Sequence, residues 1–536
     1  MATNDDALAR HQALVAGLQQ HLASAGQPVE RIDTHISTLL LAGEQAYKLK
    51  KPLALGFLDF STLAARHQSC VDELRLNRRT APQIYQAVVP VLGPAGQPRF
   101  GPADAAAAAQ VLDWAVRMRR FDRRMGLDQL AAAGQLGATH IDRLADVLTT
   151  FQQALPPADA QEGDPARALH WAQDSLDALR HWWPAGPHSL GSVSRVDALT
   201  AWVQARWRVL SPRMQVRRET GCVREGHGDL HLANIVWLDG VPVPFDALEF
   251  NTELRCIDVV NELAFPFMDL QAHGLPALAW RLANRWFETT GDHAGAALLP
   301  WYAVERALVR AKVALIGAAE AGCAAAQRMA LLTEAGRYLA TAEVLAAPPA
   351  PQLVVVWGLS GTGKSTVALA VAETLGALRL RSDVERKRLH GLPPTYRPTE
   401  PAQIYNPAST QRTYARLGEL AGQLLDDGLS VVVDAACLLR TERDALRTVA
   451  RGRNQRCTLL QCTAPEATLH ERIAARQAGN ADASDATTEV LASQQQWLQP
   501  VAPDERADSR TLDTSEPLAS VLQASRLLAA GLRAPA

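Results

Sequence analysis

The stretch GLSGTGKS, residues 358–365, has the residue types and spacing of a phosphate-binding loop. It matches the pattern G-x-x-x-x-G-K-[ST], whose glycines let backbone N–H groups turn inward around an anion at a helix N-terminus. The lysine of this pattern reaches the β- and γ-phosphates and the final hydroxyl binds Mg²⁺, so phosphoryl transfer from ATP is the expected chemistry. A glycine-rich turn without a ligand is the alternative, but the apolar strand before the loop and the helical sequence after it favour a nucleotide. The expected nucleotide-binding residues are Gly358, Ser360, Gly361, Thr362, Gly363, Lys364, Ser365 and Thr366, with Lys364 also catalytic and Ser365 on the metal.

Two aspartates follow later strands of the same region. Asp434 ends the apolar run SVVVD, where a carboxylate can hold Mg²⁺ through water, although a strand-end turn or cap is the alternative. Asp383, in the sequence RSD, follows the strand after the phosphate-loop helix, where a carboxylate can take a proton from an acceptor hydroxyl. Asp383 could also cap the next helix, and both roles are compatible, because such a cap lies at the edge of the sheet where ligands bind.

Three arginines belong to the same expected site. Arg386 lies one turn after Asp383. Arg472 and Arg476 lie one helical turn apart, ahead of the segment GNADASDA. A helix and loop of this kind can close over ATP and bring guanidinium groups to the phosphate, whereas a solvated helix face is the alternative.

A second constellation is HGDLHLAN at residues 227–234, followed by Asp246 at the end of another apolar stretch. In the spacing H-x-D-x-x-x-x-N, a carboxylate positions the acceptor hydroxyl, the asparagine reaches Mg²⁺, and a later aspartate bridges the metals. Asp229, Asn234 and Asp246 fit these roles in order, and an Asx-rich turn is the alternative. We do not expect zinc at His227 and His231, because the helix that it would need is interrupted and no suitable third ligand follows.

The elements around this second constellation are a small lobe and a helical lobe. Residues 35–41 and 45–51 predict a β-hairpin, followed by a helix over 61–79. Lys48 and Lys50 lie on the second strand and share a face, so the sequence does not choose between them as the phosphate-binding lysine; an exposed basic strand edge is the alternative. Glu73, on the predicted helix, is the expected ion-pair partner.

The Pro-rich stretch AAPPAPQ, residues 346–352, divides the chain into domains expected at 1–345 and 353–536. The first is predicted to be α+β, with a small β-containing lobe and a larger helical lobe. The second alternates short Val/Leu strands with amphipathic helices, which predicts an α/β domain with a parallel sheet covered on both faces.

Composition excludes several classes of function. With 54 Lys+Arg against 56 Asp+Glu among 536 residues, the chain lacks the basic excess of a nucleic-acid binder. The start of the chain has no secretory pattern, and no apolar run is long enough to span a bilayer, so no membrane partner is expected. Seven scattered cysteines without a C-x-x-C pair indicate free thiols and a cytoplasmic location.

The residues of the C-terminal region resemble the P-loop small-molecule kinases: gluconate kinase, chloramphenicol phosphotransferase, zeta toxin and the 5′-hydroxyl polynucleotide kinase domain. The resemblance covers about residues 353–530 and rests on the phosphate loop and the S-D-x-x-R placement. It implies that Asp383 is the general base, that Arg386 contacts the substrate, and that Arg472 and Arg476 are lid residues.

The motif H-G-D-L-H-x-x-N, followed by a strand and an aspartate, resembles the aminoglycoside phosphotransferase family of protein-kinase-like folds over about residues 30–345. The resemblance implies Asp229 as the catalytic base, Asn234 and Asp246 as Mg²⁺ ligands, and structural roles for His227 and Asp258. The chain departs from protein kinases in having no G-x-G-x-x-G loop.

The expected protein is therefore a bifunctional fusion of an aminoglycoside-phosphotransferase-like kinase with a P-loop kinase. It would use ATP and Mg²⁺ to phosphorylate hydroxyl groups of small molecules. Two alternatives stay open: the C-terminal domain phosphorylates polynucleotide 5′-hydroxyls, or one domain is a regulatory ATPase without an acceptor. The sequence names neither acceptor and does not define the oligomeric state, because acceptor pockets lie in variable loops.

Overall fold

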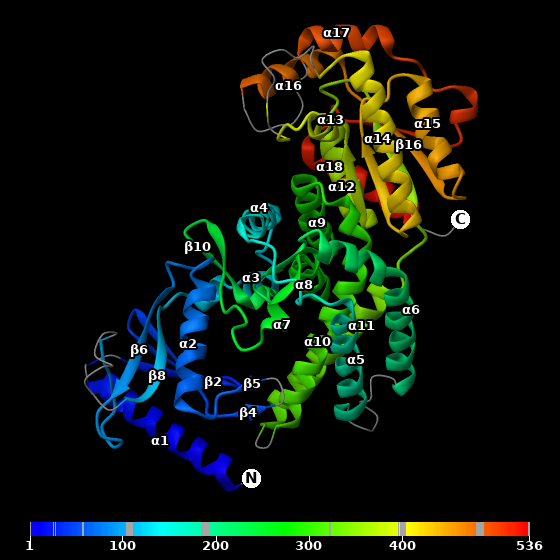
Figure 1. Ribbon diagram of the computed structural model, residues 1–536. Helices are drawn as coiled ribbons and strands as arrows, with labels where there is room; N and C mark the ends of the chain where they lie inside the picture. The colour runs from blue at the N-terminus through cyan, green and yellow to red at the C-terminus, as the bar shows by residue number, and fades with distance from the viewer. Residues whose placement is uncertain are drawn as a thin grey trace. The chain divides into compact units, whose positions relative to one another are not determined.

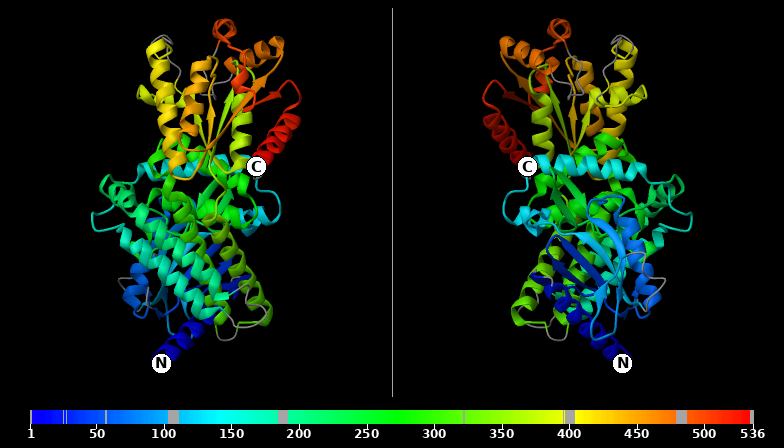
Figure 2. Two further views of the ribbon diagram at one scale, coloured as in Figure 1. Left: turned by 90° about the vertical axis from the view of Figure 1, so that its right-hand side faces the viewer. Right: turned by 90° about the vertical axis from the view of Figure 1, so that its left-hand side faces the viewer.

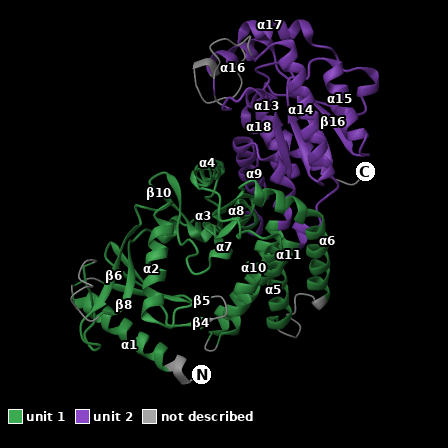
Figure 3. Cartoon of the chain, viewed as in Figure 1, with its two compact units in different colours: residues 1–269, 302–342 green, residues 270–301, 343–536 purple. Residues whose placement is uncertain are grey.

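The computed structural model describes residues 2–24, 26, 28–55, 58–102, 111–183, 192–320, 323–394, 396, 404–478 and 487–533, and of residues 2–5, 192, 193 and 476–478 it describes the backbone alone (Figure 1). The chain divides into two units (Figure 3). Unit 1 consists of Met1–Asp269 and Tyr302–Ala342, and unit 2 consists of Leu270–Trp301 and Glu343–Ala536.

Unit 1 begins with a six-stranded antiparallel sheet in the order β1-β2-β3-β8-β6-β7. The predicted hairpin is present as β2 and β3, and the predicted helix is present as α2, which begins after Thr62, whose side chain accepts a hydrogen bond from the N–H of Ala65. The elements are α1 (Ala2–Ser24), β1 (Val29–Asp33), β2 (Ser37–Ala42), β3 (Gln45–Lys50), β4 (Ala54–Leu55), β5 (Leu58–Asp59), α2 (Leu63–Asn77), β6 (Tyr85–Leu92), β7 (Arg99–Phe100) and β8 (Val111–Arg119).

Alternation along β3 decides which side chains meet α2. Leu49 packs with the α1 residues Val15 and Leu18 on one face of the sheet. Ala46 packs with Cys70 of α2 on the other face. Because side chains alternate along a strand, Lys48 and Lys50 also point to the α2 face.

The rest of unit 1 is mainly helical and carries the HGDLHLAN segment between two short β-ladders, β12-β9 and β10-β11. Its elements are η2 (Arg123–Met125), α3 (Leu127–Ala132), α4 (Ala138–Ala154), α5 (Pro165–Trp182), α6 (Ser192–Glu219), β9 (Val223–Glu225), η3 (Leu232–Asn234), β10 (Ile235–Leu238), β11 (Val241–Pro244), α7 (Thr252–Arg255), β12 (Cys256–Asp258), α8 (Val259–Ala272), α10 (Leu299–Ala319) and α11 (Ala325–Ala346). In the part of the chain that the structure describes, no helix combines the length and the hydrophobicity needed to cross a bilayer.

Unit 2 contains a five-stranded parallel sheet in the order β14-β15-β13-β16-β17, as the alternating strands and helices predicted. Helices cover both faces, with α12 and α18 packed together on one side and α14 against α15 on the other (Figure 2). The elements are β13 (Gln352–Trp357), α12 (Lys364–Leu375), β14 (Ala377–Arg381), α13 (Ser382–Leu389), α14 (Pro407–Asp426), β15 (Ser430–Asp434), α15 (Arg440–Arg451), β16 (Arg456–Thr463), α16 (Glu466–Ala478), α17 (Thr488–Trp497), η6 (Pro503–Glu505), β17 (Ser509–Asp513) and α18 (Leu518–Arg533).

Residues 270–301 differ from the sequence-based division, which placed them in the N-terminal domain. In the structure they belong to unit 2, where α9 (Pro276–Thr290) and η4 (His293–Leu298) pack. The side chain of Asn284 donates to the carbonyl oxygen of Ala377 at 2.9 Å and accepts from the N–H of Arg379 at 2.6 Å, so it closes the open edge of β14. An amphipathic pattern does not reveal which core a helix faces, which is why the sequence did not indicate this exchange.

Candidate active sites

Hydrogen bonds from side chains and backbone groups fix the HGDLHLAN segment of unit 1. The ring of His227 bonds the carbonyl oxygen of Phe245 through Nε2 at 2.8 Å, so this nitrogen is the donor. The amide of Asn234 donates to the backbone oxygen of Asp229 at 2.8 Å and to its carboxylate at 3.2 Å. Asp229 and Asn234, which the spacing predicted to serve one site, therefore lie side by side, and the buried His227 fixes the segment through its bond to Phe245.

Asp229 is kept in its charged form. Burial raises the pKa of its carboxyl group, but His231, whose Nε2 lies 3.4 Å from Oδ2, and more distantly Arg310 outweigh that effect and hold the pKa below its ordinary value. The Asp229 side chain is 34% exposed, so a solute can reach it. An ionised and accessible carboxylate can accept a proton from a hydroxyl group.

Two acidic residues of α8 accept hydrogen bonds from backbone N–H groups of this segment. They were not identified from the sequence. Glu262 accepts from the N–H groups of His227 at 2.8 Å and Gly228 at 3.2 Å. Asp269 accepts from the N–H of Leu232 at 2.8 Å. The available signal was their spacing, because residues seven apart lie on the same helix face.

Asp258 has contacts that fit its expected structural role. Its carboxylate receives two hydrogen bonds from the guanidinium group of Arg217, at 2.7 and 2.9 Å, and a third from the N–H of Val260 at 2.8 Å. The carboxylate is thereby fully occupied and fixes the start of α8.

Lys48, Lys50 and Glu73 meet in the small lobe, as their common face predicted. Lys48 Nζ lies 2.9 Å from Glu73 and forms a second ion pair with Asp246. Lys50 pairs with Glu73 and with Glu249. Both lysines are buried, so an exposed basic strand edge is excluded. Of the two lysines, only Lys48 forms an ion pair with Asp246, one of the two residues of unit 1 expected to bind Mg²⁺.

The charges of Lys48 and Asp246 stabilise each other. Burial lowers the pKa of Lys48, but Asp246 and Glu73 outweigh it and raise that pKa well above the ordinary value. Burial raises the pKa of Asp246, and Lys48 lowers it to a net value below the ordinary one. The Asp246 side chain is 41% exposed, so its ionised carboxylate is open to a cation. With Asn234 nearby, this oxygen donor set fits Mg²⁺.

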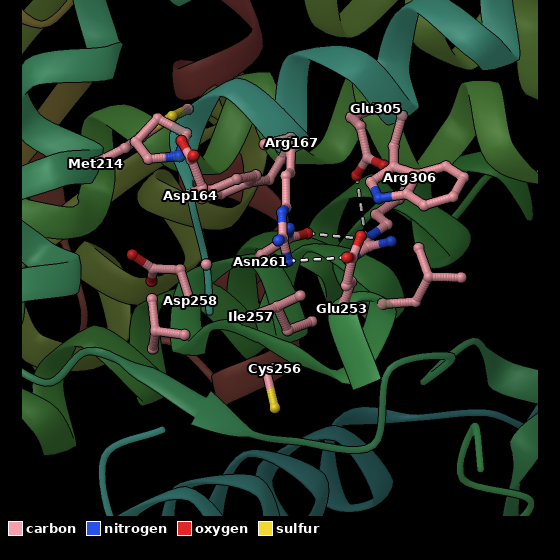
Figure 4. Close-up of a pocket in the computed structure, with 17 residues that line it drawn as sticks. Asp164, Arg167, Met214, Glu253, Cys256, Ile257, Asp258, Asn261, Glu305 and Arg306 are labelled. Atoms are coloured by element: carbon pink, nitrogen blue, oxygen red, sulfur yellow. Dashed lines mark hydrogen bonds and ion pairs between the residues drawn. The ribbon is translucent and has the colours of Figure 1, made fainter. Parts of the chain in front are cut away.

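A cavity in unit 1 lies beside Asp258 and not at the HGDLHLAN segment (Figure 4). Its wall contains the ion pair Arg167–Glu253 at 2.9 Å and the hydrogen bond from Arg306 to Asn261 at 2.8 Å. Its volume of about 50 Å³ has room for a few water molecules. It is therefore too small for a phosphorylatable metabolite together with ATP.

The phosphate loop of unit 2 joins β13 to α12 in the expected strand–loop–helix order. Gly358, Gly361 and Gly363 have φ values of +145°, +85° and +73°. A Cβ atom at Gly358 would lie 2.5 Å from the carbonyl oxygen of Cys462, and one at Gly361 would lie 2.8 Å from that of Leu469. Other residues would be strained or would clash at these positions, so the glycines are required by the turn.

Residues expected to act in catalysis lie at the carboxyl-terminal ends of neighbouring strands of the parallel sheet. Register pairs Asp434 with Val356 of β13 on one side and with Arg381 of β14 on the other. Asp434 is 3% exposed, and its Oδ2 atom lacks a hydrogen-bond partner in the described part of the chain. A buried carboxylate oxygen that receives no hydrogen bond fits Mg²⁺ bound directly or through water.

Lys364 and Asp383 have side chains with no hydrogen bond or ion pair among the residues that the structure describes. Lys364 is the first residue of α12, and Asp383 is in the first turn of α13. The helix α13 begins at Ser382 after Arg381, so Asp383 is not its cap. A lysine and a carboxylate without partners at the edge of the sheet are available to a ligand.

The arginines expected around this site differ in their surroundings. Arg386 is buried, donating to the Ile404 carbonyl at 3.3 Å and to the Thr410 hydroxyl at 3.1 Å, with the Tyr405 ring 5.0 Å from its Cζ. Arg472 donates to the carbonyl oxygens of Gly361 at 3.4 Å and Thr514 at 2.6 Å, so it holds the outside of the phosphate loop.

Two further residues concern the segment that was expected to close over ATP. The side chain of Arg476 and the segment 479–486 lie outside what the structure describes. Gln494 of α17, which sequence reasoning missed, accepts from the N–H of Ser360 in the phosphate loop at 2.8 Å.

Comparison with known proteins adds to this geometry. Residues 353–501 match a family described as an AAA domain. Over 474 residues the chain is 31% identical to the uncharacterized protein Rv2004c of Mycobacterium tuberculosis, in an alignment that covers 86% of this chain and 89% of the mycobacterial protein. The chain belongs to the family of this mycobacterial protein. The family relationship therefore spans both units and not only the phosphate loop.

Two solved structures are each similar to a part of this chain. A gluconokinase from Sinorhizobium meliloti 1021 is 25% identical over 35% of this chain and 95% of its own, with a TM-score of 0.26. A choline/ethanolamine kinase family protein from Mesorhizobium loti is 12% identical over 59% of this chain and 92% of its own, with a TM-score of 0.35.

Proposed function

We propose that the protein is an ATP-dependent phosphotransferase with two active sites, each of which phosphorylates a hydroxyl group of a small molecule. The observation that carries the proposal for unit 1 is the meeting of Lys48 with Asp246 and of Asp229 with Asn234. These groups come from a strand, a loop and a strand end up to 198 residues apart in sequence. In unit 2 the proposal is supported by the phosphate loop, with its positive-φ glycines, and by the carboxylates of Asp383 and Asp434.

In unit 1, Lys48 would orient the phosphates of ATP, and Asn234 and Asp246 would hold Mg²⁺. The metal, when bound, neutralises charge on the β- and γ-phosphate oxygens. Asp229 would remain ionised and accept the proton of the acceptor hydroxyl while that oxygen attacks the γ-phosphorus of ATP, whose bond to the bridging oxygen breaks to release ADP. His227, Glu262 and Asp269 fix the loop that carries Asp229, so the carboxylate is positioned before the substrate arrives.

In unit 2, backbone N–H groups of the phosphate loop and the ammonium group of Lys364 would surround the β- and γ-phosphates. Ser365 and Asp434 would hold Mg²⁺ there. Asp383 would accept the proton of a second acceptor. Arg386 lies on the same helix, where its buried guanidinium group would shape the acceptor pocket with Tyr405.

The acceptors are proposed to be small hydroxyl compounds and the protein cytoplasmic. Holding a polynucleotide end requires a basic groove with stacking aromatics. The net charge of −2 offers no such excess.

The experiment that tests the proposal uses the full chain and γ-labelled ATP with a broad panel of hydroxyl metabolites. Asp229→Asn should abolish one set of phosphorylated products, and Lys364→Ala should abolish the other set. The double variant should make none, while retaining its circular dichroism spectrum. Hydrolysis of ATP without any labelled product would reject the transferase assignment, and labelling that persists in the double variant would reject the sites.

A further inference from the structure

Glu288, on α9 of unit 2, connects two arginines of β14. Its carboxylate lies 2.6 Å from the guanidinium group of Arg379 and 3.0 Å from that of Arg381. The Glu288 side chain is 18% exposed, so water screens these ion pairs only partly. Burial raises the pKa of Glu288, but the two arginines outweigh it and lower that pKa. The carboxylate therefore remains charged and holds both guanidinium groups.

The same two arginines reach the residues expected to bind Mg²⁺. Arg379 donates to the carbonyl oxygen of Ser365 at 3.1 Å. Arg381 places Nε 3.6 Å from Oδ2 of Asp434, beyond hydrogen-bond distance. This oxygen of Asp434 is the one without a hydrogen-bond partner among the described residues.

The charge balance of this cluster explains why a carboxylate is needed. A guanidinium group bonded to Asp434 would compete with a cation for the carboxylate oxygens, because an arginine fork matches a carboxylate geometrically. Glu288 supplies that match from α9, so Arg381 donates a hydrogen bond to Glu288 and makes only the longer ion pair with Oδ2 of Asp434.

We propose that Glu288 is a positioning residue for the phosphotransfer site of unit 2, which restrains Arg381 and Arg379 so that Asp434 and Ser365 are available to Mg²⁺. The inference rests on the proposed function of that site. It assigns to residues 270–301, which lie inside the N-terminal region of the sequence, a part in the chemistry of the phosphate loop.

The helix α9 has other attachments, so Glu288 can be changed without detaching it. Asn284 pairs with the backbone of β14 on both sides of Leu378. Arg281 forms an ion pair with Glu373 of α12 at 2.8 Å. Arg281→Gln is therefore a matched control, because it removes an α9 ion pair of the same kind that does not reach Asp434 or Ser365.

The test measures ADP binding by calorimetry as Mg²⁺ is titrated, in the full chain with Asp246→Ala, so that the Mg²⁺-dependent signal comes from unit 2. Glu288→Gln should raise the Mg²⁺ concentration for half-maximal binding by about tenfold. It should leave ADP affinity in EDTA unchanged. Arg281→Gln should lower the melting temperature and leave the Mg²⁺ midpoint in place.

A double variant separates positioning from a loss of folding. If Glu288 acts by restraining Arg381, then Glu288→Gln combined with Arg381→Met should return the Mg²⁺ midpoint toward that of the parent. An unchanged midpoint in Glu288→Gln, an equal shift in Arg281→Gln, or no recovery in the double variant overturns the inference. If the parent itself binds no Mg²⁺-ADP and Lys364→Ala changes nothing, the proposed function of unit 2 fails, and the inference fails with it.

Discussion

Lys48 contacts the carboxylate of Asp246, a residue 198 positions later in the chain. The neighbouring Lys50 lies on the same strand face but pairs with Glu73 and Glu249. Strand alternation makes the two lysines equivalent in the sequence, and the contact with Asp246 distinguishes them. We therefore propose that Lys48 orients the phosphates and that Lys50 has a structural role.

Lys48→Met should reduce phosphotransfer by unit 1 about 10²- to 10³-fold, the usual effect of removing one charge-stabilising donor. The fold should persist, because Glu73 keeps Lys50 as its partner and Asp246 is 41% exposed to water. Lys50→Met should instead destabilise unit 1 by about 3–5 kcal/mol, because it leaves the buried Glu249 with a hydroxyl partner, Ser69, in place of a cation. Steady-state kinetics and urea unfolding of both variants check the assignment, and the reverse pattern contradicts it.

Asp383→Asn should lower phosphotransfer by unit 2 about 10²- to 10⁴-fold while ATP binding persists, because a general base acts on the acceptor and not on the nucleotide. Single-turnover transfer and calorimetry measure the two effects separately. A 5′-hydroxyl oligonucleotide serves as a second acceptor in the same assay. Efficient labelling of the oligonucleotide, with binding that weakens steeply as salt is added, would show that the acceptor is a polynucleotide and not a small molecule. Full activity of Asp383→Asn would show that Asp383 is not the general base.

A fragment of residues 350–536 should be markedly less stable than unit 2 in the full chain, because it lacks α9. It loses the Asn284 bonds to β14 and the ion pairs of Arg281 and Glu288. At about 0.5–3 kcal/mol for each such interaction, the melting temperature should fall by on the order of 10 °C. Joining residues 270–301 to residues 343–536 through a flexible linker should restore it. If the 350–536 fragment and the protein that includes residues 270–301 melt at the same temperature, α9 does not stabilise the sheet.

Unit 1 should lose stability as the pH falls from 7 to 4, in part because of His11. Burial first, and then the positive charges of Arg66 and Lys51, lower the pKa of His11 from 6.5 to about 4. The unfolded chain therefore binds a proton below pH 6.5 that the folded chain binds only near pH 4, so stability rises with pH in this window. The contribution is about 3 kcal/mol.

His11→Gln should flatten that pH dependence, since glutamine does not titrate. Hydrogen–deuterium exchange of α1 and β2 at several pH values, corrected for intrinsic exchange, reports the local free energy of opening. His21, which is on the same helix, serves as a matched control through His21→Gln. Identical pH profiles of wild type and His11→Gln would show that the imidazole does not limit stability.

The sequence predicted most of what lies near a motif in the chain. The strand before the phosphate loop, the parallel sheet, and the hairpin with Lys48 could be read from local periodicity and turn residues. The positions of Glu262 and Asp269 could have been read from their spacing on α8. The backbone N–H groups that bond to these two acids could not be predicted, because a hydrogen bond to the backbone leaves no pattern in the residue types.

The position of α9 could not be predicted for a different reason. Asn284 completes an edge strand with its side-chain amide, and Glu288 pairs with arginines about 90 residues later. Such contacts depend on which unit a helix packs against, and an Ala/Leu-rich helical pattern fits either one.

The assignment of residues 270–301 to unit 2 has a consequence for synthesis on the ribosome. Asn284 emerges 93 residues before Ala377, the strand residue that it contacts. At about 5–20 residues per second, α9 waits for roughly 5–20 seconds before the strand residue that it contacts is made, and the remaining strands of the sheet follow later still. Meanwhile residues 302–342 of unit 1 emerge and can complete that unit. The newly made chain must therefore keep one amphipathic helix unpartnered without aggregation, and translation speed or a chaperone acting on this helix would set the yield of the complete protein.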